Sequence, residues 1–457
     1  MQQDLIQKYN NPVPRYTSYP PANFFSDKYT SSEFIRAIEK SNDWLPQNIS
    51  IYIHIPFCKR MCFYCGCNSC PIADKSTVKD YVKALRHEIS LISSSLDKNR
   101  KVAQIHYGGG TPNAIYAEYL QEINEQLFET FDFIEKPEIA IECNPAYLDL
   151  PYLDILHEAK FNRYSLGIQD FDLKVLKSVN REPSTLPVSD IMSYVKGKNP
   201  EVSFNLDFIY GLPHQSVKSF SDTIKQAIEI RPDRLVTFSY AHVPWVNKAQ
   251  MMLEKEGLPT SDEKINMFNK AHGLLLDSGY KTIGMDHYVL ETDELYQALE
   301  SGNLHRNFQG YCTRRTTGQV YAFGVSAISQ LHKAYAQNTK SNEDYIRSIG
   351  RGKLPIVKGY DLSDKEIIIR EVINEIMCKS TIEWQEISQR FNIDVPHLKN
   401  TIRYDERQLK DFAKDDIIEF SDKHVSITPG GSFFVRNVAA SFDPMYNAEN
   451  NRFSKPV

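Results

Sequence analysis

Cysteines are concentrated in one short stretch of this chain. Five of the eight lie between Cys58 and Cys70, and four of them, at Cys58, Cys62, Cys65 and Cys67, are spaced C-x3-C-x2-C-x-C. Thiolates this close together on one loop can converge on a single metal centre. The spacing therefore predicts a metal centre, and the kind of metal decides what chemistry the chain can do.

Zinc, disulfides and an iron–sulfur cluster are three ways to use such cysteines. Structural zinc sites usually present two separated pairs of Cys or His ligands, whereas this chain has one triplet with no second pair nearby. Disulfides are uncommon in a long chain without a secretory leader, and the first ten residues show none. Three cysteines can hold a four-iron cluster and leave one iron open to a ligand. We favour the cluster, with zinc or a redox thiol cluster as alternatives.

Strand and helix patterns alternate on both sides of this loop. Apolar stretches predict six strands, at Ile49–Ile55, Val102–Tyr107, Glu138–Glu142, Arg163–Ile168, Val202–Ile209 and Arg234–Tyr240. Helical spacing predicts helices at Thr77–Ser95, Ile115–Phe128, Tyr152–Ala159 and Ser216–Glu229. Such repeats indicate an α/β fold with a parallel sheet and right-handed connections, curled into a full or partial βα barrel.

Polar residues or glycines lie at or just past the ends of all six strands. They are His54, Gly108 to Gly110, Glu142, Gln169, Asp207 and Tyr240 to His242. Active sites of βα barrels are built at those ends, so we expect one shared cavity. The glycine triplet can offer N–H groups to a carboxylate. Taken singly, a flexible turn or a helix-capping carboxylate explains such residues equally well.

The two ends of the chain break this alternation. Prolines at positions 12, 14, 20 and 21 disfavour a helix over residues 1 to about 30 and predict an extended tail that packs on the body. Ser363 with Glu366 predicts a capping box that opens a helix, with further helices at Glu383–Phe391 and within Leu398–Phe412, then a hairpin at 417–427. We predict three domains: a tail over the active site at 1–35, a catalytic barrel at 36–355 and a mainly helical, winged-helix-like domain at 356–457.

Composition limits the function further. The net charge is −5 with dispersed lysine and arginine, which argues against a nucleic-acid-binding surface. No apolar run is long enough to cross a bilayer. Eight cysteines without a leader indicate a reducing compartment. We therefore expect a cytoplasmic monomer with no nucleic-acid or membrane partner.

Motifs along most of the chain identify a family. C-x3-C-x2-C with Tyr64 before the third cysteine resembles the cluster loop of the radical S-adenosylmethionine (radical SAM) superfamily. Further segments resemble the oxygen-independent coproporphyrinogen III oxidases: PRYTSYP (14–20), YGGGTP (107–112), NRYSLGIQDF (162–171), VNRE (179–182), NLDFIYGLP (205–213), IGMDHY (283–288), LHRNFQGY (304–311) and GVSAIS (324–329). The resemblance implies a partial (β/α)6 radical SAM barrel.

The resemblance also implies an activity and its cofactors. Cys58, Cys62 and Cys65 would ligate a [4Fe–4S] cluster whose open iron chelates S-adenosylmethionine (SAM). Reductive cleavage of SAM would release a 5′-deoxyadenosyl radical, which takes a hydrogen atom from a propionate of coproporphyrinogen III. Loss of CO2 and one electron would leave a vinyl group. Two such reactions would give protoporphyrinogen IX for haem biosynthesis, so the chain is expected to be an oxidoreductase.

Matching motif positions imply the other site residues. The cluster-bound SAM would contact Tyr52, Gly109, Glu142 and Ile328, and a second SAM in the same cavity would contact Gly110, Thr111, Gln169, Arg181, Asp207 and Ala241. Cys67 matches a fourth cysteine of the family that is not a cluster ligand, and we assign it to catalysis. The family also implies an electron donor such as flavodoxin or ferredoxin, and an electron acceptor that is unidentified.

A substrate with four carboxylates needs cationic partners. We expect Arg15 in the tail and Arg306 in LHRNFQGY to supply some of them, because arginine is well suited to pairing with carboxylates. Two surface arginines without such a role are the alternative.

Two related functions are alternatives to the oxidase. A radical SAM haem-trafficking protein would bind haem, but such relatives generally lack the PRYTSYP tail and the equivalent of Cys67, both of which this chain has. A haem-degrading radical SAM methyltransferase has a related barrel, so the barrel sequence distinguishes it poorly from the oxidase. The intact PRYTSYP tail favours the oxidase.

Overall fold

The structure is a computed structural model that describes residues 2–72, 74–313, 319–447 and 453–455. The chain forms two compact units, each assembled from separate parts of the sequence. The sheet unit comprises Ser26–Gly279 and Arg314–Tyr360, and the C-terminal unit comprises Met1–Phe25, Tyr280–Thr313 and Asp361–Val457. These units are defined by contacts, so the functional domains at 1–35, 36–355 and 356–457 stay a prediction.

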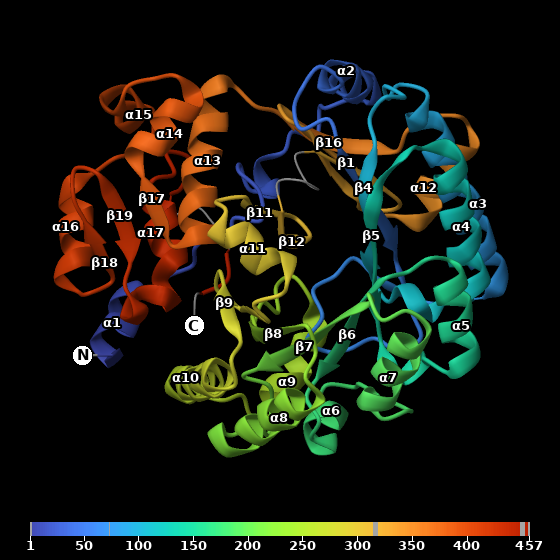
Figure 1. Ribbon diagram of the computed structural model, residues 1–457, viewed down its shortest axis with the longest axis horizontal. Helices are drawn as coiled ribbons and strands as arrows, with labels where there is room; N and C mark the ends of the chain where they lie inside the picture. The colour runs from blue at the N-terminus through green and yellow to red at the C-terminus, as the bar shows by residue number, and fades with distance from the viewer. Residues whose placement is uncertain (1, 73, 314–318, 448–452, 456–457) are drawn as a thin grey trace. The chain divides into compact units, whose positions relative to one another are not determined.

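A parallel sheet whose strands follow chain order is the centre of the sheet unit (Figure 1). Its strands are β1 (Ile49–Ile55), β4 (Val102–Gly109), β5 (Phe133–Cys143), β6 (Arg163–Gln169), β7 (Ser203–Tyr210) and β8 (Arg234–Ser239). Each pairs in parallel with the next. Nearly every side chain of β1 is buried, as in a strand covered on both faces. The α/β fold with six parallel strands that the sequence predicted is confirmed.

Four short strands extend this sheet beyond β1. The first, β13 (Val320–Phe323), is parallel to β1, and β14 (Ile328–Gln330) and β15 (Ala334–Asn338) continue it in antiparallel pairs. The last is β16 (Ile356–Asp361). The sequence analysis missed all four, because strands of three to six residues carry little alternation to detect.

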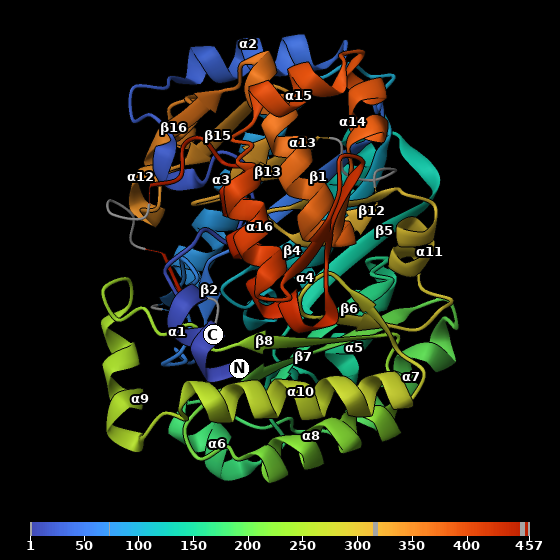
Figure 2. The same cartoon turned by 90° about the vertical axis from the view of Figure 1, so that its left-hand side faces the viewer.

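Helices cover the sheet, and Figure 1 shows α3, α4 and α5 side by side. They include α3 (Lys75–Ser93), α4 (Ala117–Thr130), α5 (Leu150–Glu158), α7 (Val188–Lys198), α8 (Val217–Ile230) and α10 (Ser261–Asp277). Figure 2 shows α8 and α10 packed along one another. The sheet unit also contains α2 (Ser31–Ser41), α6 (Leu173–Ser178), α9 (Met251–Glu256) and α12 (Asn342–Gly350).

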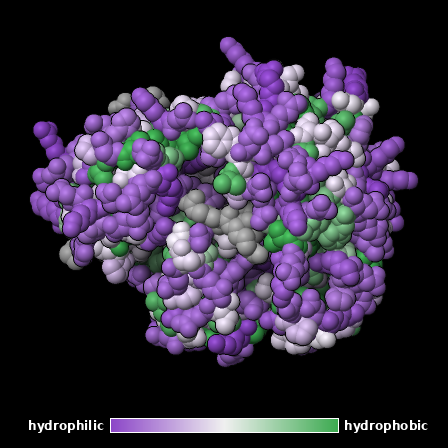
Figure 3. Space-filling model, turned by 45° about the horizontal axis from the view of Figure 1, so that its top comes forward, coloured by the Kyte–Doolittle hydropathy of each residue, from purple (hydrophilic) through white to green (hydrophobic). Residues whose placement is uncertain are grey.

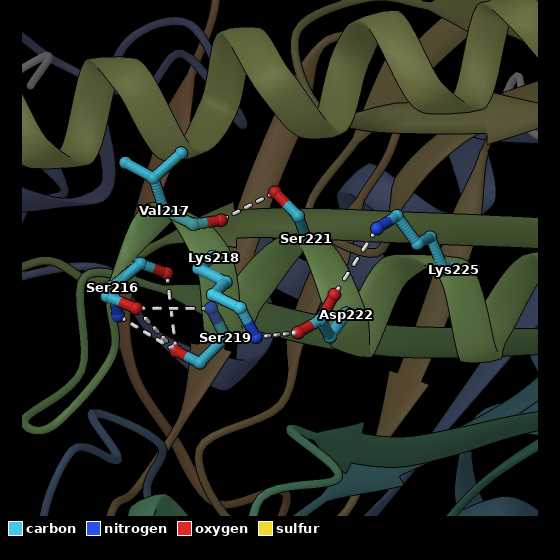
Figure 4. Close-up of polar contacts among 7 residues, drawn as sticks. All are labelled: Ser216, Val217, Lys218, Ser219, Ser221, Asp222 and Lys225. Carbon is cyan, nitrogen blue, oxygen red and sulfur yellow. Dashed lines mark hydrogen bonds and ion pairs between the residues drawn. The ribbon is translucent and has the colours of Figure 1, made fainter.

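Local hydrogen bonds explain where α8 begins (Figure 4). The Ser216 hydroxyl accepts from the backbone N–H of Ser219 at 3.1 Å, and the Ser219 hydroxyl accepts from the N–H of Ser216 at 2.9 Å. This is a capping box, which satisfies N–H groups that the first turn leaves unbonded. One turn later, Asp222 forms ion pairs with Lys218 and Lys225 on the exposed face. The predicted helix at Ser216–Glu229 is thus right to within one residue at each end.

The C-terminal unit is mainly helical. Its elements are α1 (Gln2–Tyr9), β9 (Lys281–Ile283), β10 (His287–Val289), α11 (Glu294–Glu300), β11 (Leu304–Asn307), β12 (Gly310–Thr313), α13 (Asp364–Lys379), β17 (Thr381–Glu383), α14 (Trp384–Phe391), α15 (Val395–Thr401), α16 (Glu406–Lys414), β18 (Ile418–Phe420), β19 (His424–Ile427) and α17 (Val435–Ser441). Its core surrounds Trp384, which is fully buried, with the Phe442 ring at 5.8 Å. The predicted capping box at Ser363 and the hairpin formed by β18 and β19 are confirmed.

Two expectations for this unit are corrected. Residues 2–9 form the helix α1, because the first proline that would break a helix is Pro12. The single helix expected within Leu398–Phe412 is two helices, α15 and α16. Each has its own N-cap, with Asp394 accepting from the N–H of His397 and Asp405 accepting from that of Arg407.

The tail packs inside the C-terminal unit. The Tyr9 ring lies 5.4 Å from that of Phe412 and 5.6 Å from that of Phe434. The Tyr16 hydroxyl donates to Asp443 at 2.9 Å. These contacts give the aromatic tail a place to be buried, and its position over the active site stays a prediction.

The exterior in Figure 3 is mainly hydrophilic, with hydrophobic side chains scattered among charged ones. Among the described residues, no helix is both long and apolar enough to span a bilayer.

Candidate active site

The cysteine loop leaves the sheet directly after β1. Its start, β2 (Phe57–Cys58), pairs in parallel with its end, β3 (Cys70–Pro71), so the loop closes on itself. The backbone N–H of Cys70 donates to the carbonyl of Pro56 at 2.8 Å. The loop therefore stands at the C-terminal end of a central strand, where parallel sheets place their ligands.

Each of the three predicted cluster ligands has its own polar neighbour. Cys58 Sγ lies 3.5 Å from Thr111 Oγ1, and Cys62 Sγ accepts a hydrogen bond from Arg181 Nη1 at 3.5 Å. The pKa of the Cys58 thiol is raised by burial. Thr111 and Arg181, both predicted to contact SAM, thus lie next to the thiols that are predicted to hold the cluster.

Cys65 and Cys67 interact with each other. The backbone N–H of Cys67 donates to Cys65 Sγ at 3.4 Å. A hydrogen bond from the Cys67 side chain lowers the pKa of Cys65 to about 7, towards the thiolate form that binds metals. Cys67 itself is an exposed residue, and its catalytic role stays a prediction.

Distant side chains hold the backbone of this loop. Asn247 Nδ2 donates to the carbonyl of Cys65 at 2.6 Å, and Gln250 Nε2 donates to the carbonyl of Tyr64 at 2.9 Å. Both lie after β8, more than 180 residues away. The sequence analysis missed them, because nothing in their local spacing distinguishes them from ordinary loop amides.

Tyr52, Gly108 and Glu142 meet on the adjacent strands β1, β4 and β5. A Cβ atom at Gly108 would lie 2.9 Å from Glu142 Oε1 and 3.0 Å from the Tyr52 hydroxyl, so a larger residue there would displace the end of the Glu142 side chain. Glu142 Oε1 lies 3.0 Å from His106 Nε2, and its side chain is about half exposed. The Tyr52 and His106 rings stack at 6.0 Å. This arrangement leaves a carboxylate with room for an outside hydrogen-bond donor.

The other two glycines of the triplet differ in what they can offer. Gly109 has φ +119°, and a Cβ there would lie 2.8 Å from the His54 ring. Gly110 donates its N–H to the carbonyl of Ile55 at 2.8 Å. The expectation that Gly110 offers its N–H to a ligand carboxylate is therefore wrong, because the backbone already uses that donor. Any contact that Gly110 makes with SAM has to use its other atoms.

Gln169 and Arg181 meet around the end of β6. Gln169 has φ +71° at a register shift in the pairing of β6 with β7, an irregularity that often occurs beside active sites. Its Oε1 is buried and has no protein partner, whereas Arg181 Nη2 donates to the carbonyl of Gly167. A buried acceptor without a partner costs stability, so a ligand donor is expected there.

Asp207 is fixed within the sheet. Its Oδ2 accepts from the Ser165 hydroxyl and its Oδ1 from Asn205 Nδ2, both at 2.8 Å. Ala241 follows β8, and Ile328 begins β14. The grouping of Ala241 and Ile328 with the other predicted site residues stays a prediction.

His54 connects three segments that the sequence analysis treated separately. Its Nε2 lies 3.0 Å from the carbonyl of Asn68 and 3.5 Å from the Ser326 hydroxyl, and its ring fills the space above Gly109. Burial lowers the pKa of His54. The Tyr81 hydroxyl donates to the His54 carbonyl at 2.7 Å. His54 thus supports the cysteine loop from inside the sheet unit.

Arg15 and Arg306 belong to the C-terminal unit. Arg306 Nη1 donates to the carbonyl of Arg15 at 3.0 Å, and its guanidinium lies 5.2 Å from the centre of the Tyr311 ring. The pKa of Arg436 is lowered to about 9, first by burial and then by the positive charges of Arg15 and Arg306. Asp286 is the carboxylate beside Arg15 and Arg306, and its pKa is held below the usual range by His287 and by both arginines despite its burial.

The residues present fit the implied cofactors. Among the described residues, no three His, Cys, Asp or Glu side chains are arranged to hold a single metal ion. A four-iron cluster requires a different arrangement, because each cysteine binds a different iron atom. The three loop thiols match that donor set. The half-exposed carboxylate of Glu142 and the unpartnered Oε1 of Gln169 suit a polar ligand such as SAM.

Comparisons with known proteins support the same interpretation. Residues 52–227 match the Radical SAM superfamily, and residues 362–434 match the HemN C-terminal domain. The chain is 37% identical to an oxygen-independent coproporphyrinogen III oxidase of Synechocystis sp., over 96% of this chain and 94% of that one. It is 36% identical to the one of Escherichia coli, over 99% and 98%.

A solved structure agrees over nearly the full length. It is the coproporphyrinogen III oxidase (HemN) from Escherichia coli, described as a radical SAM enzyme. The TM-score is 0.86 at 33% identity, covering 97% of this chain and 99% of that chain. This confirms the resemblance predicted from the motifs. The chain belongs to the family of oxygen-independent coproporphyrinogen III oxidases, within the radical SAM superfamily.

Proposed function

We propose that this chain converts two propionate side chains of coproporphyrinogen III into vinyl groups without oxygen, giving protoporphyrinogen IX. Each propionate loses CO2, one hydrogen atom and one electron. The observation that carries the proposal is the loop of three thiols placed at the C-terminal end of β1, beside the polar ends of β4, β5 and β6. Its family membership supplies the substrate.

The proposed ligands of the [4Fe–4S] cluster are Cys58, Cys62 and Cys65. When the cluster and SAM are bound, one-electron cleavage of SAM supplies a carbon radical able to take a hydrogen atom. Tyr52, Gly109, Glu142 and Ile328 are proposed to hold the first SAM, and Gly110, Thr111, Gln169, Arg181, Asp207 and Ala241 a second one. Glu142 suits an ammonium or ribose hydroxyl, because its carboxylate is only partly occupied by His106.

Arg181 and Gln169 have distinct roles in this arrangement. Arg181 fixes its guanidinium on the Gly167 carbonyl and on Cys62 Sγ, so it places positive charge beside a cluster ligand. Gln169 directs an unpartnered amide oxygen from a strained backbone position. Arg181 offers positive charge to a carboxylate, and Gln169 accepts a hydrogen bond from an amino group. This pair suits a ligand that carries both groups.

Arg15 and Arg306 are proposed to bind propionates. They lie close to Arg436, whose pKa is lowered first by burial and then by their positive charges. Arg15 and Arg306 both lie near Asp286, and Arg436 lies near these two arginines, so a carboxylate ligand is a suitable further partner for this group of cations. We expect Arg15→Ala and Arg306→Ala each to raise the KM for the porphyrinogen on the order of tenfold, while Lys358→Ala, at an exposed lysine, leaves it unchanged. Unchanged KM values in both arginine variants would contradict this role.

The remaining partners are proposed by the same reasoning. An acidic low-potential carrier such as flavodoxin or ferredoxin would supply the electron for SAM cleavage, and a separate, unidentified acceptor would take the electron from the substrate radical. All eight cysteines are free thiols, which supports a cytoplasmic location. We also propose that the protein acts as a monomer.

An anaerobic assay tests the proposal. Reconstituted protein is incubated with coproporphyrinogen III, SAM and dithionite, and the divinyl product and methionine are measured. Two SAM molecules consumed per protoporphyrinogen IX would agree with one cleavage for each vinyl group. Stoichiometric haem binding without turnover of the porphyrinogen would instead indicate a trafficking protein.

A further inference from the structure

Five large apolar side chains are exposed next to the cysteine loop, and we name them the apolar patch. Leu173, at the start of α6, is 65% exposed, and Trp245 and Val246, after β8, are 53% and 64% exposed. Met251 and Met252, which begin α9, are 52% and 45% exposed. Exposed aromatic and methionine side chains close together are typical of protein interfaces. Nothing in the proposed reaction uses them.

The segments that carry the apolar patch are fastened to the cysteine loop. Asn247 and Gln250, which lie between Val246 and Met251, donate hydrogen bonds to the backbone of the loop. Beneath the patch, Phe63 of the loop shares one apolar cluster with α6 and α9. Figures 1 and 2 both show α6 and α9 at the lower end of the sheet unit. The patch is thus an outer layer around the loop of thiols.

Positive charge accompanies the apolar patch. The loop, α6 and the segment at 245–256 carry six exposed basic residues, Lys59, Arg60, Lys174, Lys177, Lys248 and Lys255, of which Arg60 forms an ion pair with Glu182 at 3.3 Å. Three acidic residues lie in the same segments, and each has a partner. Asp172 caps α6, Glu254 bonds His242 and Glu256 bonds His214. This basic excess stands out in a chain of net charge −5. Such a surface attracts an acidic partner by electrostatic steering.

We propose that the apolar patch and its basic residues are the docking surface for a small acidic protein that carries a low-potential one-electron centre. The inference rests on the proposed function, because only a redox cluster under the loop needs such a donor. Electron transfer falls steeply with distance, so a donor has to approach the loop itself. Complexes of this kind are small and transient, which suits a compact apolar centre with a charged rim.

The electron count of the step is simple. With flavodoxin as the carrier, FMN hydroquinone loses one electron and becomes the semiquinone, and the oxidised cluster gains that electron. The carrier then leaves to be reduced again. A weak complex whose formation depends on charge fits this cycle, because release has to be fast.

Charge reversal of four lysines tests the surface. The variant carries Lys174→Glu, Lys177→Glu, Lys248→Glu and Lys255→Glu, none of which belongs to the cysteine loop. The matched control reverses four exposed lysines elsewhere in the sheet unit, Lys40, Lys79, Lys83 and Lys98, and so has the same net charge. Stopped-flow absorbance measures the reduction of the reconstituted enzyme by flavodoxin hydroquinone, and calorimetry measures its binding to oxidised flavodoxin.

We expect the patch variant to lose at least about tenfold in both the second-order rate and the affinity at low salt, whereas the control keeps wild-type values. The difference should shrink as salt is raised, because salt screens exposed charges. Turnover with excess dithionite should stay at the wild-type level. Equal behaviour of the patch variant and the control with flavodoxin would overturn the proposal.

A second variant covers the case in which four reversals damage the fold. Trp245→Ala with Met251→Ala removes apolar area without changing charge, and we expect weaker flavodoxin binding with an unchanged salt dependence. Wild-type affinity in this variant would also overturn the proposal. A stable dimer or binding to lipid vesicles that buries these residues would assign the surface to another occupant. Failure of all proteins with dithionite would instead count against the proposed function, so the two failures are distinguishable.

Discussion

The cysteine loop and the core of the C-terminal unit are held together by opposite means. The core surrounds Trp384 with apolar side chains, and buried hydrogen bonds such as that from Tyr16 to Asp443 supplement this packing. The loop is largely irregular, and side-chain amides such as those of Asn247 and Gln250 fix its backbone carbonyls. Packing makes the first region stable on its own, whereas polar contacts keep the second in shape without filling the space a cofactor needs. The comparison teaches that stability and cofactor binding can be changed separately in this chain.

The largest expected effect is on the loop. Replacing Cys58, Cys62 and Cys65 by serine should abolish vinyl formation and reduce bound iron from about four atoms per chain to near zero. The C-terminal core contains none of these residues, so its unfolding should be unchanged. Iron analysis after anaerobic reconstitution checks the first expectation and near-UV circular dichroism the second. The same triple change at Cys143, Cys312 and Cys378 is the control, and loss of iron there would contradict the assignment.

Trp384→Ala should have the converse effect. Removing this fully buried side chain should lower the free energy of unfolding by about 3–5 kcal/mol, because it leaves a cavity in the core. Bound iron should remain at the wild-type level. Trp245→Ala, at an exposed position, is the control and should change the free energy of unfolding by less than about 0.5 kcal/mol. Chemical denaturation measures both, and loss of iron in Trp384→Ala would show that the two regions are coupled.

Glu88 is a buried carboxyl group in the sheet unit, so it tests how a buried polar contact affects the stability of that unit. Its carboxyl accepts hydrogen bonds from the Tyr345 hydroxyl at 2.6 Å, Asn338 Nδ2 at 2.7 Å and the N–H of Gly324 at 2.8 Å. Burial raises the pKa of Glu88 to about 7, although these hydrogen bonds oppose the rise. The folded state therefore binds this proton more tightly than the unfolded state, and its stabilising effect is lost as the pH rises from 4.5 to 7.

We expect wild-type protein to lose roughly 2–3 kcal/mol of unfolding free energy across that pH range through this group. Glu88→Gln should flatten the slope, because an amide does not titrate. Tyr81 and Tyr345, which face Glu88, have pKa values raised by burial and do not titrate in this range. Denaturation at pH 5, 6 and 7 measures the slope, and an equally steep slope in the variant would refute this account.

The smallest expected effect is on the support of the loop. Asn247→Ala removes one hydrogen bond to the Cys65 carbonyl and should cost about 1 kcal/mol. Iron should then be lost to a chelator about fivefold faster, which corresponds to the same free energy. Asn303→Ala removes an exposed local hydrogen bond to Ser301 and serves as the control. Equal rates of iron loss in the two variants would mean that Asn247 does not stabilise the loop.

The sequence alone predicted the parallel strands and the family, because both depend on local patterns and motifs. The capping pair of Ser363 with Glu366, predicted from its spacing and confirmed, shows how far short spacing can be used. The supports of the site could not be predicted in this way. Asn247 donates a hydrogen bond to the carbonyl of Cys65, 182 residues away in the sequence. The N–H of Gly110 donates to the carbonyl of Ile55 on a neighbouring strand. Such contacts depend on how the strands are ordered in space, and the local spacing of residues in the sequence does not determine that order.

The discontinuous make-up of the C-terminal unit affects the order in which the chain can fold during synthesis. Tyr9 packs on Phe412 and Phe434, and Tyr16 bonds Asp443, and each of these partners leaves the ribosome more than 400 residues after the tyrosine it contacts. The described contacts of the thiol-bearing loop are complete much earlier. A nascent protein thus has its iron-binding segment finished while its two ends have yet to meet.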